Sequence, residues 1–187
     1  MKREKGQFEY LKYQKLLKFF IMLIAYIVVL AVFFVGLAIK GTRNNPFTVA
    51  AILLVLPSAK FTVNFLVLAI HKATPKSLYE YCKQYEDKTF ILYDAVFSNE
   101  SYPIGCKACL VTEKLIYAYS DEKKASEKLF SESLEKFLAN VGIEVKVELV
   151  KDEEAFKKKL QHVADSRQKA DTGLAKRVRN NLLGILL

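Results

Sequence analysis

The sequence predicts an α-helical transmembrane hairpin followed by a small cytoplasmic α/β (α+β) domain, in the order α-β-β-(β)-α-β-α-α. Two long apolar runs, of 21 and 24 residues, lie within the first 70 residues and are separated by a short polar connector. The remaining residues alternate between helix-like and strand-like patterns of apolar side chains. The net charge of +9 is concentrated near the apolar runs, because residues 1–70 hold nine basic and two acidic side chains.

The first apolar run, residues 19–39, is expected to cross the membrane as a helix. It has no charged residue, and its only polar side chain is that of Tyr26. At 1.5 Å per residue the run is about 31 Å long, which matches a hydrocarbon core of about 30 Å. It is too long for the apolar part of a cleaved signal peptide, and no small-residue cleavage site precedes the connector.

The connector is expected to turn the chain back. Gly41 can end the first helix, and Asn45 followed by Pro46 is typical of an N-cap and a first helical turn. The second apolar run, residues 47–70, then returns antiparallel to the first, so that residues 19–71 form the hairpin. The alternative is that this second run is re-entrant or lies along the membrane surface.

Three polar residues interrupt the second run, and they form the candidate binding site of the sequence: Ser58, Lys60 and Asn64. Pro57 removes a backbone N–H and bends the helix beside them, and Lys60 and Asn64 share one helix face. An intramembrane lysine is a functional hypothesis by default, although a kinked, locally hydrated helix would also tolerate it. The first span offers no acid, so the expected partner of Lys60 is another copy, another protein, a lipid phosphate or water.

The basic residues predict the orientation. Residues 1–18 form a basic juxtamembrane segment with six Lys or Arg side chains, whereas the connector has two, and two more follow the second span. The positive-inside rule therefore places both termini in the cytoplasm of a multi-pass protein in the cell membrane, with lipid as one partner. Residues 71–187 have twenty basic and eighteen acidic side chains, a net charge of +2, so a nucleic-acid partner is not expected.

Residues 74–187 are expected to form a mixed α/β domain of roughly 110 residues, near the usual domain size. The predicted elements are, in order, a helix at 77–87, a strand at 88–97, a turn-rich segment at 98–105, two strands joined at 112–114 or one bent strand, a helix at 126–142, a strand at 143–150 and a helix that Asp152 caps.

Apolar spacing predicts the buried faces of these elements. One strand face is expected to carry Ile91, Tyr93, Ala95 and Phe97, and another Ile143, Val145, Val147 and Leu149. The helix at 126–142 is expected to bury Leu129, Phe130, Leu134, Phe137, Leu138 and Val141.

A last amphipathic helix is predicted at residues 171–186. Leu174, Val178 and Leu182 repeat at helical spacing, with basic side chains opposite. This helix either docks on the domain or lies on the anionic membrane surface.

The Cys106-x-x-Cys109 motif is the strongest match to a catalytic or metal-binding pattern. Such a pair suits thiol–disulfide chemistry or half of a zinc site. Its expected place on a strand would aim the two side chains at opposite faces, and no further Cys or His lies at zinc-finger spacing. Buried structural cysteines are therefore expected, with no metal and no cofactor.

Two resemblances accompany these predictions. The element order resembles that of the restriction-endonuclease-like core, whose nucleases place an Asp and then Glu-x-Lys on adjacent strands. Asp94 is a lone acid here and no such triplet follows, so the resemblance concerns the fold alone. Separately, the first 70 residues with "LPSAKFTVN" look like a group of uncharacterised small bacterial membrane proteins with two spans and an L-P-x-x-K turn. That resemblance implies a bacterial origin and two spans, and it says nothing about activity.

The expected function is a non-catalytic binding or scaffold role at the membrane, with a protein partner or self-association through the second span. One alternative is a membrane-tethered enzyme with a site scattered over residues 88–165, built from groups such as Asp94, Glu113 and Tyr117. Another is a small subunit of a transporter or channel complex.

Overall fold

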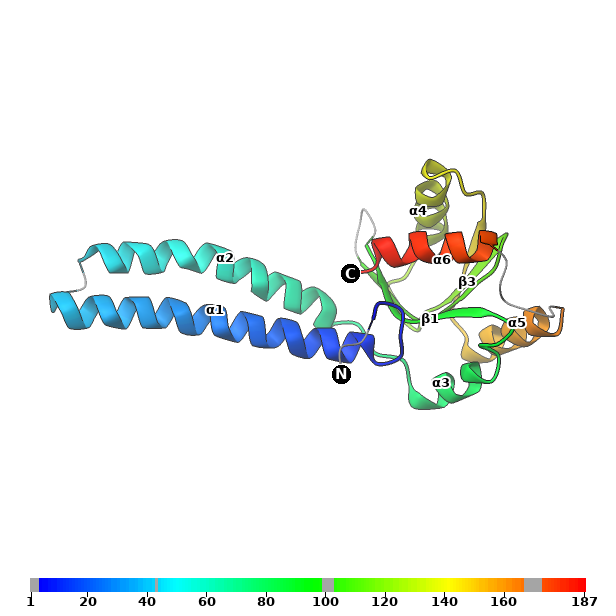
Figure 1. Ribbon diagram of the computed structural model, residues 1–187, viewed down its shortest axis with the longest axis horizontal. Helices are drawn as coiled ribbons and strands as arrows, with labels where there is room; N and C mark the ends of the chain where they lie inside the picture. The colour runs from blue at the N-terminus through cyan, green and yellow to red at the C-terminus, as the bar shows by residue number, and fades with distance from the viewer. Residues whose placement is uncertain (1–3, 43, 99–102, 167–172) are drawn as a thin grey trace. The chain divides into compact units, whose positions relative to one another are not determined.

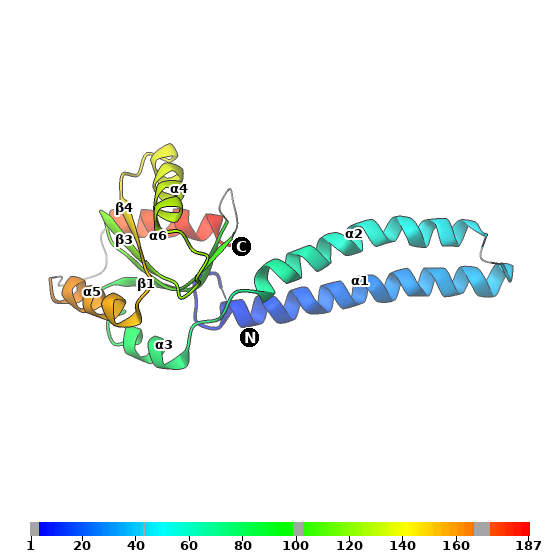
Figure 2. The same ribbon diagram turned by 180° about the vertical axis from the view of Figure 1, so that it is seen from behind.

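The computed structural model describes residues 4–42, 44–98, 103–166 and 173–187. The chain divides into two compact units (Figures 1 and 2). One unit, residues 12–70, holds the two long helices. The other, residues 1–11 together with 71–187, is an α/β domain, so the residues just before and just after the helical unit belong to the domain.

The first unit is an antiparallel helical hairpin, as predicted. α1 spans Tyr10–Lys40 and α2 spans Pro46–Ala69. The hydroxyl groups of Tyr26 and Thr62 lie 3.1 Å apart, and the ammonium group of Lys15 donates to the carbonyl of Ala69 at 3.2 Å. Because a residue early in α1 contacts one late in α2, the two helices run in opposite directions.

The turn of the hairpin confirms the predicted cap. The Asn45 side chain accepts a hydrogen bond from the N–H of Thr48 at 2.9 Å and donates to the carbonyl of Gly36 at 3.2 Å. A Cβ at position 36 would lie 2.3 Å from the Cβ of Phe47, so glycine is required where the helices approach each other. One amide thus begins α2 and ties it to α1.

Both helices are long and apolar enough to cross a membrane. Most of their large apolar side chains are exposed, including Leu56 and Ile39. A core helix of a soluble protein would bury these side chains, so the exposure is consistent with two membrane spans.

The domain is built on one four-stranded sheet in the order β1-β2-β3-β4. β1, β2 and β3 are antiparallel neighbours, while β4 runs parallel to β3 after a helical connection. The observed order of elements in this domain, α-β-β-β-α-β-α-α, is the predicted one, with three separate strands before α4. The elements are α3 (Lys76–Lys83), β1 (Phe90–Phe97), β2 (Ile104–Val111), β3 (Leu115–Tyr119), α4 (Glu127–Asn140), β4 (Lys146–Val150), α5 (Glu153–Asp165) and α6 (Gly173–Ile185).

Helices cover both faces of the sheet (Figures 1 and 2). α4 and α6 pack on one face, where Phe130 and Leu182 join the apolar side chains of the strands. α3 and α5 pack on the other, where Leu78 and Phe156 are fully buried. The domain therefore has three layers and two cores. β2 is buried from both sides along its whole length, whereas Lys146 and Glu148 of the edge strand β4 are exposed.

The C-terminal helix docks on the domain. Ala175, Val178 and Leu182 of α6 are fully buried against the sheet, whereas Leu174, expected on the same face, is 45% exposed. Residues 171 and 172, the predicted start of the helix, lie outside the described residues. Of the two alternatives, packing on the domain is the one observed.

The predicted buried face of α4 is partly wrong, whereas that of β4 is confirmed. α4 buries Phe130, Leu134 and Leu138, but Leu129 and the C-cap residue Val141 are exposed and Phe137 is half-buried. All four inward residues expected around β4 are buried: Ile143, Val145, Val147 and Leu149.

The predicted single face of β1 is wrong. Ala95 and Phe97 point into the core beneath α4 and α6, whereas Tyr93 points into the opposite core. The cause is Asp94, whose φ of +51° breaks the extended geometry between them. The strand changes face at this residue.

Candidate functional site

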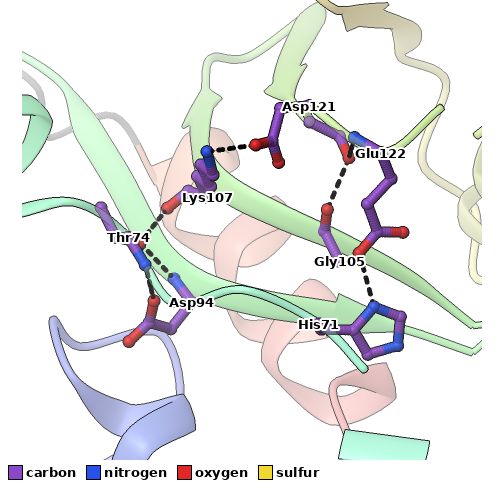
Figure 3. A network of polar contacts seen from close by, with 8 residues as sticks. His71, Thr74, Asp94, Gly105, Lys107, Asp121 and Glu122 are labelled. Atoms are coloured by element: carbon purple, nitrogen blue, oxygen red, sulfur yellow. Dashed lines mark hydrogen bonds and ion pairs between the residues drawn. The ribbon is translucent and has the colours of Figure 1, made fainter. Parts of the chain in front are cut away.

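A polar cluster, buried except for Asp121 and Glu122 at its edge, surrounds the change of face in β1 (Figure 3). Its side chains come from the segment after α2, from β1 and β2, and from the loop between β3 and α4. The cluster consists of His71, Thr74, Asp94, Lys107, Ser120, Asp121 and Glu122, together with the backbone of Gly105.

Asp94 is the centre of this polar cluster. Its carboxylate accepts hydrogen bonds from the Thr74 N–H at 2.6 Å and from the Leu11 N–H at 3.3 Å. The Thr74 hydroxyl lies 2.7 Å from the carboxylate and 2.6 Å from the carbonyl of Lys107, and its proton serves one of these acceptors at a time. Asp94 is only 2% exposed. The Asp94 side chain therefore binds both Leu11, just before the helical unit, and Thr74, just after it.

The contact with Leu11 places a carboxylate at the start of α1. The first N–H groups of a helix have no partner within the helix, and the helix dipole favours a negative group there. Asp94 acts as a capping group for α1 from a distant part of the sequence. The positive φ brings its carboxylate to this position, and aspartate tolerates that φ better than most residues do.

Lys107 lies opposite Asp94 on the neighbouring strand, between the register pairs Tyr93–Ala108 and Ala95–Cys106. Its ammonium group is 2.7 Å from the carboxylate of Asp121 and 5.6 Å from the ring centre of Tyr119. Lys107 is 8% exposed, so the acid neutralises a largely buried cation.

His71 follows α2 directly and is 2% exposed. Its Nδ1 lies 2.5 Å from a carboxylate oxygen of Glu122. Both side chains pack on Gly105, where an added Cβ would lie 2.6 Å from the Glu122 oxygen and 2.8 Å from Nδ1. The absence of a side chain at position 105 is therefore what lets the pair approach β2.

The charges of the polar cluster are balanced by nearby partners. Each charged side chain of the polar cluster is paired inside it: Asp94 with the Thr74 and Leu11 donors, Lys107 with Asp121, and His71 with Glu122. Within the part of the chain that the structure describes, no three His, Cys, Asp or Glu side chains are placed to hold a metal ion.

Two hollows of the described domain lie away from the polar cluster. One has a volume of about 550 Å³ and is lined mainly by α4, including Leu129, Phe137 and Lys136. The other, of about 560 Å³, lies between the end of α4 and the start of β4 and includes Ile143 and Glu144. No residue of the polar cluster lines either hollow.

The three residues predicted for a scattered enzyme site, Asp94, Glu113 and Tyr117, do not lie together around one hollow. Asp94 is in β1 and Tyr117 is in β3, with β2 between them. The Tyr117 ring contacts the ammonium group of Lys159, 4.6 Å from its centre, and Glu113 lies in the β2–β3 turn. None of the three predicted residues lines a described hollow.

The structure separates the three polar residues of the second span. Ser58 is 2% exposed and donates a hydrogen bond to the carbonyl of Leu54 at 2.8 Å. Lys60 and Asn64 are exposed. Ser58 therefore does not form one notch with Lys60, although Lys60 and Asn64 share a face as expected.

The expectation that Cys106 and Cys109 point to opposite faces is wrong. Both side chains lie in the core beneath α4 and α6, because the change of face at Asp94 is matched in β2 at Lys107. Burial, together with a hydrogen bond to Cys109, raises the pKa of the Cys106 thiol well above its usual range. Burial also raises the pKa of the Cys82 thiol, to about 12. Protonated thiols are poor nucleophiles and poor metal ligands, so the environment of Cys106 and Cys109 suits packing in the core.

The raised pKa values of these thiols should make the folded domain less stable at alkaline pH. Free thiols ionise near pH 8.5 in an unfolded chain, whereas those of Cys82 and Cys106 stay protonated in the folded domain. The unfolded state therefore loses protons first, and the contribution is complete below pH 8.5 and declines above it. We expect the free energy of unfolding to fall by roughly 1.4 kcal/mol per pH unit for each thiol between pH 9 and 10.

Urea unfolding of the micelle-bound protein, followed by circular dichroism, measures this slope. The Cys82→Ala variant is expected to be less stable than the native chain at pH 8. Because it lacks one buried thiol, its free energy of unfolding should fall less steeply between pH 9 and 10. Equal stability at pH 8 and pH 10 would contradict the assignment.

Sequence reasoning missed the polar cluster. The available signal was an acid inside the apolar stretch Ile91–Phe97, because a buried aspartate needs donors. Nothing in the sequence indicates that those donors belong to residues 11 and 74.

No protein-family profile, no curated protein and no solved structure matches this chain. These comparisons give no support to the predicted resemblance to the restriction-endonuclease-like core.

Proposed function

We propose that this chain is a non-catalytic binding subunit of the cell membrane. The hairpin crosses the bilayer, both termini lie in the cytoplasm, and the α/β domain is held there to bind a protein partner.

The observation that carries this proposal is the set of contacts made by Asp94. A buried aspartate in a strained conformation is a feature typical of functional sites. Here its donors are the backbone of Leu11 and both donors of Thr74, the residues that adjoin the helical unit. Asp94 thus holds together, within the domain, the two chain segments that lead into and out of the helical unit.

The distribution of charge supports the proposed orientation. The helical unit is flanked by basic side chains at its N-terminal end, and the domain is almost neutral, which favours cytoplasmic termini. The L-P-x-x-K resemblance to small bacterial two-span proteins supports the same architecture.

Cysteine labelling in intact cells tests the orientation. The native cysteines are buried, so an introduced thiol reports its own position. Thr42→Cys, in the connector, is expected to react with a membrane-impermeant maleimide. Lys128→Cys, whose native side chain is 83% exposed on α4, is expected to react only after permeabilisation. The reverse pattern, or recovery of the chain in the soluble fraction, would refute the proposal.

Isolation under mild conditions tests the binding role. In mild detergent and in nanodiscs we expect the chain to migrate with a second protein at fixed stoichiometry, well above its own 21.4 kDa. A monomer in both media would refute the binding role even if the orientation were right.

A further inference from the structure

The outer face of α2 bears two polar side chains that point away from α1. This face consists of Val49, Leu53, Leu56, Lys60 and Asn64, which repeat every three to four residues and are all exposed. The polar groups that interact inside the hairpin, Ser58 and Thr62, lie on the opposite side of α2. A polar residue in a span normally faces another helix or a water-filled cavity, and α1 does not cover this face.

Lys60 lies deep in the span. It is nine residues from the end of α2 at Ala69, which corresponds to about 13 Å along the helix axis. Half of a hydrocarbon core is about 15 Å. A lysine side chain, about 6 Å long, extends towards the headgroups but does not cover that distance. Lipid phosphate is therefore a poor partner for this cation.

The chain itself provides no countercharge in the membrane, because residues 12–70 contain neither Asp nor Glu. A second copy is no better a partner. The common dimer is self-complementary about a two-fold axis, so pairing along the outer face would bring Lys60 close to its equivalent. Two like charges at low dielectric repel strongly.

We infer that the outer face of α2 binds a transmembrane helix of a different protein, and that this helix carries a carboxylate at the depth of Lys60. Asn64 lies one turn from Lys60 on the same face and adds a hydrogen-bonding group. Pro57 has no N–H to donate, so the carbonyl of Leu53 offers an acceptor beside them. The inference rests on the proposed function and specifies its partner.

Photo-cross-linking in intact cells tests this assignment. Benzoylphenylalanine at Leu56 reports on the outer face one turn from Lys60. The matched control is Leu30, which is 54% exposed on α1 and lies at similar depth, since residue 26 of α1 contacts residue 62 of α2. At Leu56 we expect an adduct with one other membrane protein, and at Leu30 no adduct with that protein.

Variants of Lys60 test whether its charge is responsible for the contact with the partner helix. The adduct should persist in Lys60→Arg and fall at least tenfold in Lys60→Leu. Lys60→Leu removes the cost of a buried charge, so its amount in the membrane should not fall. The partner, identified by mass spectrometry, should carry an Asp or Glu within a span. Exchanging the charges, with Lys60→Asp and the partner's acid changed to lysine, should restore the adduct.

Several outcomes would overturn the inference: an adduct with a second copy, with lipid alone, or of unchanged yield in Lys60→Leu, or a partner span without an acid. If the complex isolated in mild detergent survives while Leu56 gives no adduct, only this inference fails. If no complex is isolated at all, the proposed function fails as well.

Discussion

Replacing Asp94 with alanine is expected to lower the free energy of unfolding of the domain by about 3–5 kcal/mol. Two buried backbone donors, the N–H groups of Thr74 and Leu11, lose their acceptor, and each unsatisfied donor costs about 1–3 kcal/mol. The Thr74 hydroxyl can still donate to the carbonyl of Lys107. Alanine also tolerates the φ of +51° poorly. Urea unfolding of the full chain in micelles measures the loss.

Hydrogen exchange locates the effect. In the Asp94→Ala variant, amides near Leu11 and Thr74 should exchange faster than in the native chain, more than those of α5. Asp94→Gly relieves the backbone strain but not the lost acceptor, so it should remain close to alanine. The control is Asp152→Asn at the start of α5, where asparagine still caps the helix and the change should stay within about 0.5 kcal/mol. Equal effects at positions 94 and 152 would refute the central place of Asp94.

Gly105→Ala is expected to destabilise the domain by about 1–3 kcal/mol, the usual cost of overpacking a filled interior. The new methyl group would lie 2.6 Å from the carboxylate of Glu122 and 3.0 Å from the Cβ of His71. The carboxylate end of the Glu122 side chain can move away. The Cβ of His71 cannot, because it is attached directly to the backbone. The variant should therefore separate the two side chains, and the ring signals of His71 in NMR spectra should shift.

Gly184→Ala is the matched control for this change. A Cβ at position 184 meets no atom within 4 Å, and the residue lies in α6. Alanine is a better helix former, so the variant should be neutral or more stable by up to about 1 kcal/mol. A loss at position 184 as large as that at position 105 would show that the steric argument is wrong.

The hairpin was predictable because its signals are local. A span needs a long apolar run, and a cap needs an asparagine before a proline, and both are visible in residues 19–70. The structure confirms the cap at Asn45 and the antiparallel arrangement of the two helices, in which Tyr26 contacts Thr62. The helices and strands of the domain followed from apolar spacing for the same reason.

The faces of β1 and β2 were not predictable in this way. Alternation assumes an extended backbone at every residue, and Asp94 violates it with a positive φ. The same break brings Cys106 and Cys109 to one core. The sequence showed an acid in an apolar strand, but not the two distant donors that hold it in this conformation.

By itself, the sequence determined two long apolar helices, the cap of the second helix, the order of the elements in the domain and the absence of Asp and Glu from residues 12–70. Each of these depends on residues close together in the chain. Only the tertiary structure decided that Asp94 joins residues 11 and 74, that α6 packs on the sheet, and that Lys60 faces away from α1. These depend on which segments meet in space, and hydrogen-bond partners far apart in the chain leave no periodic pattern.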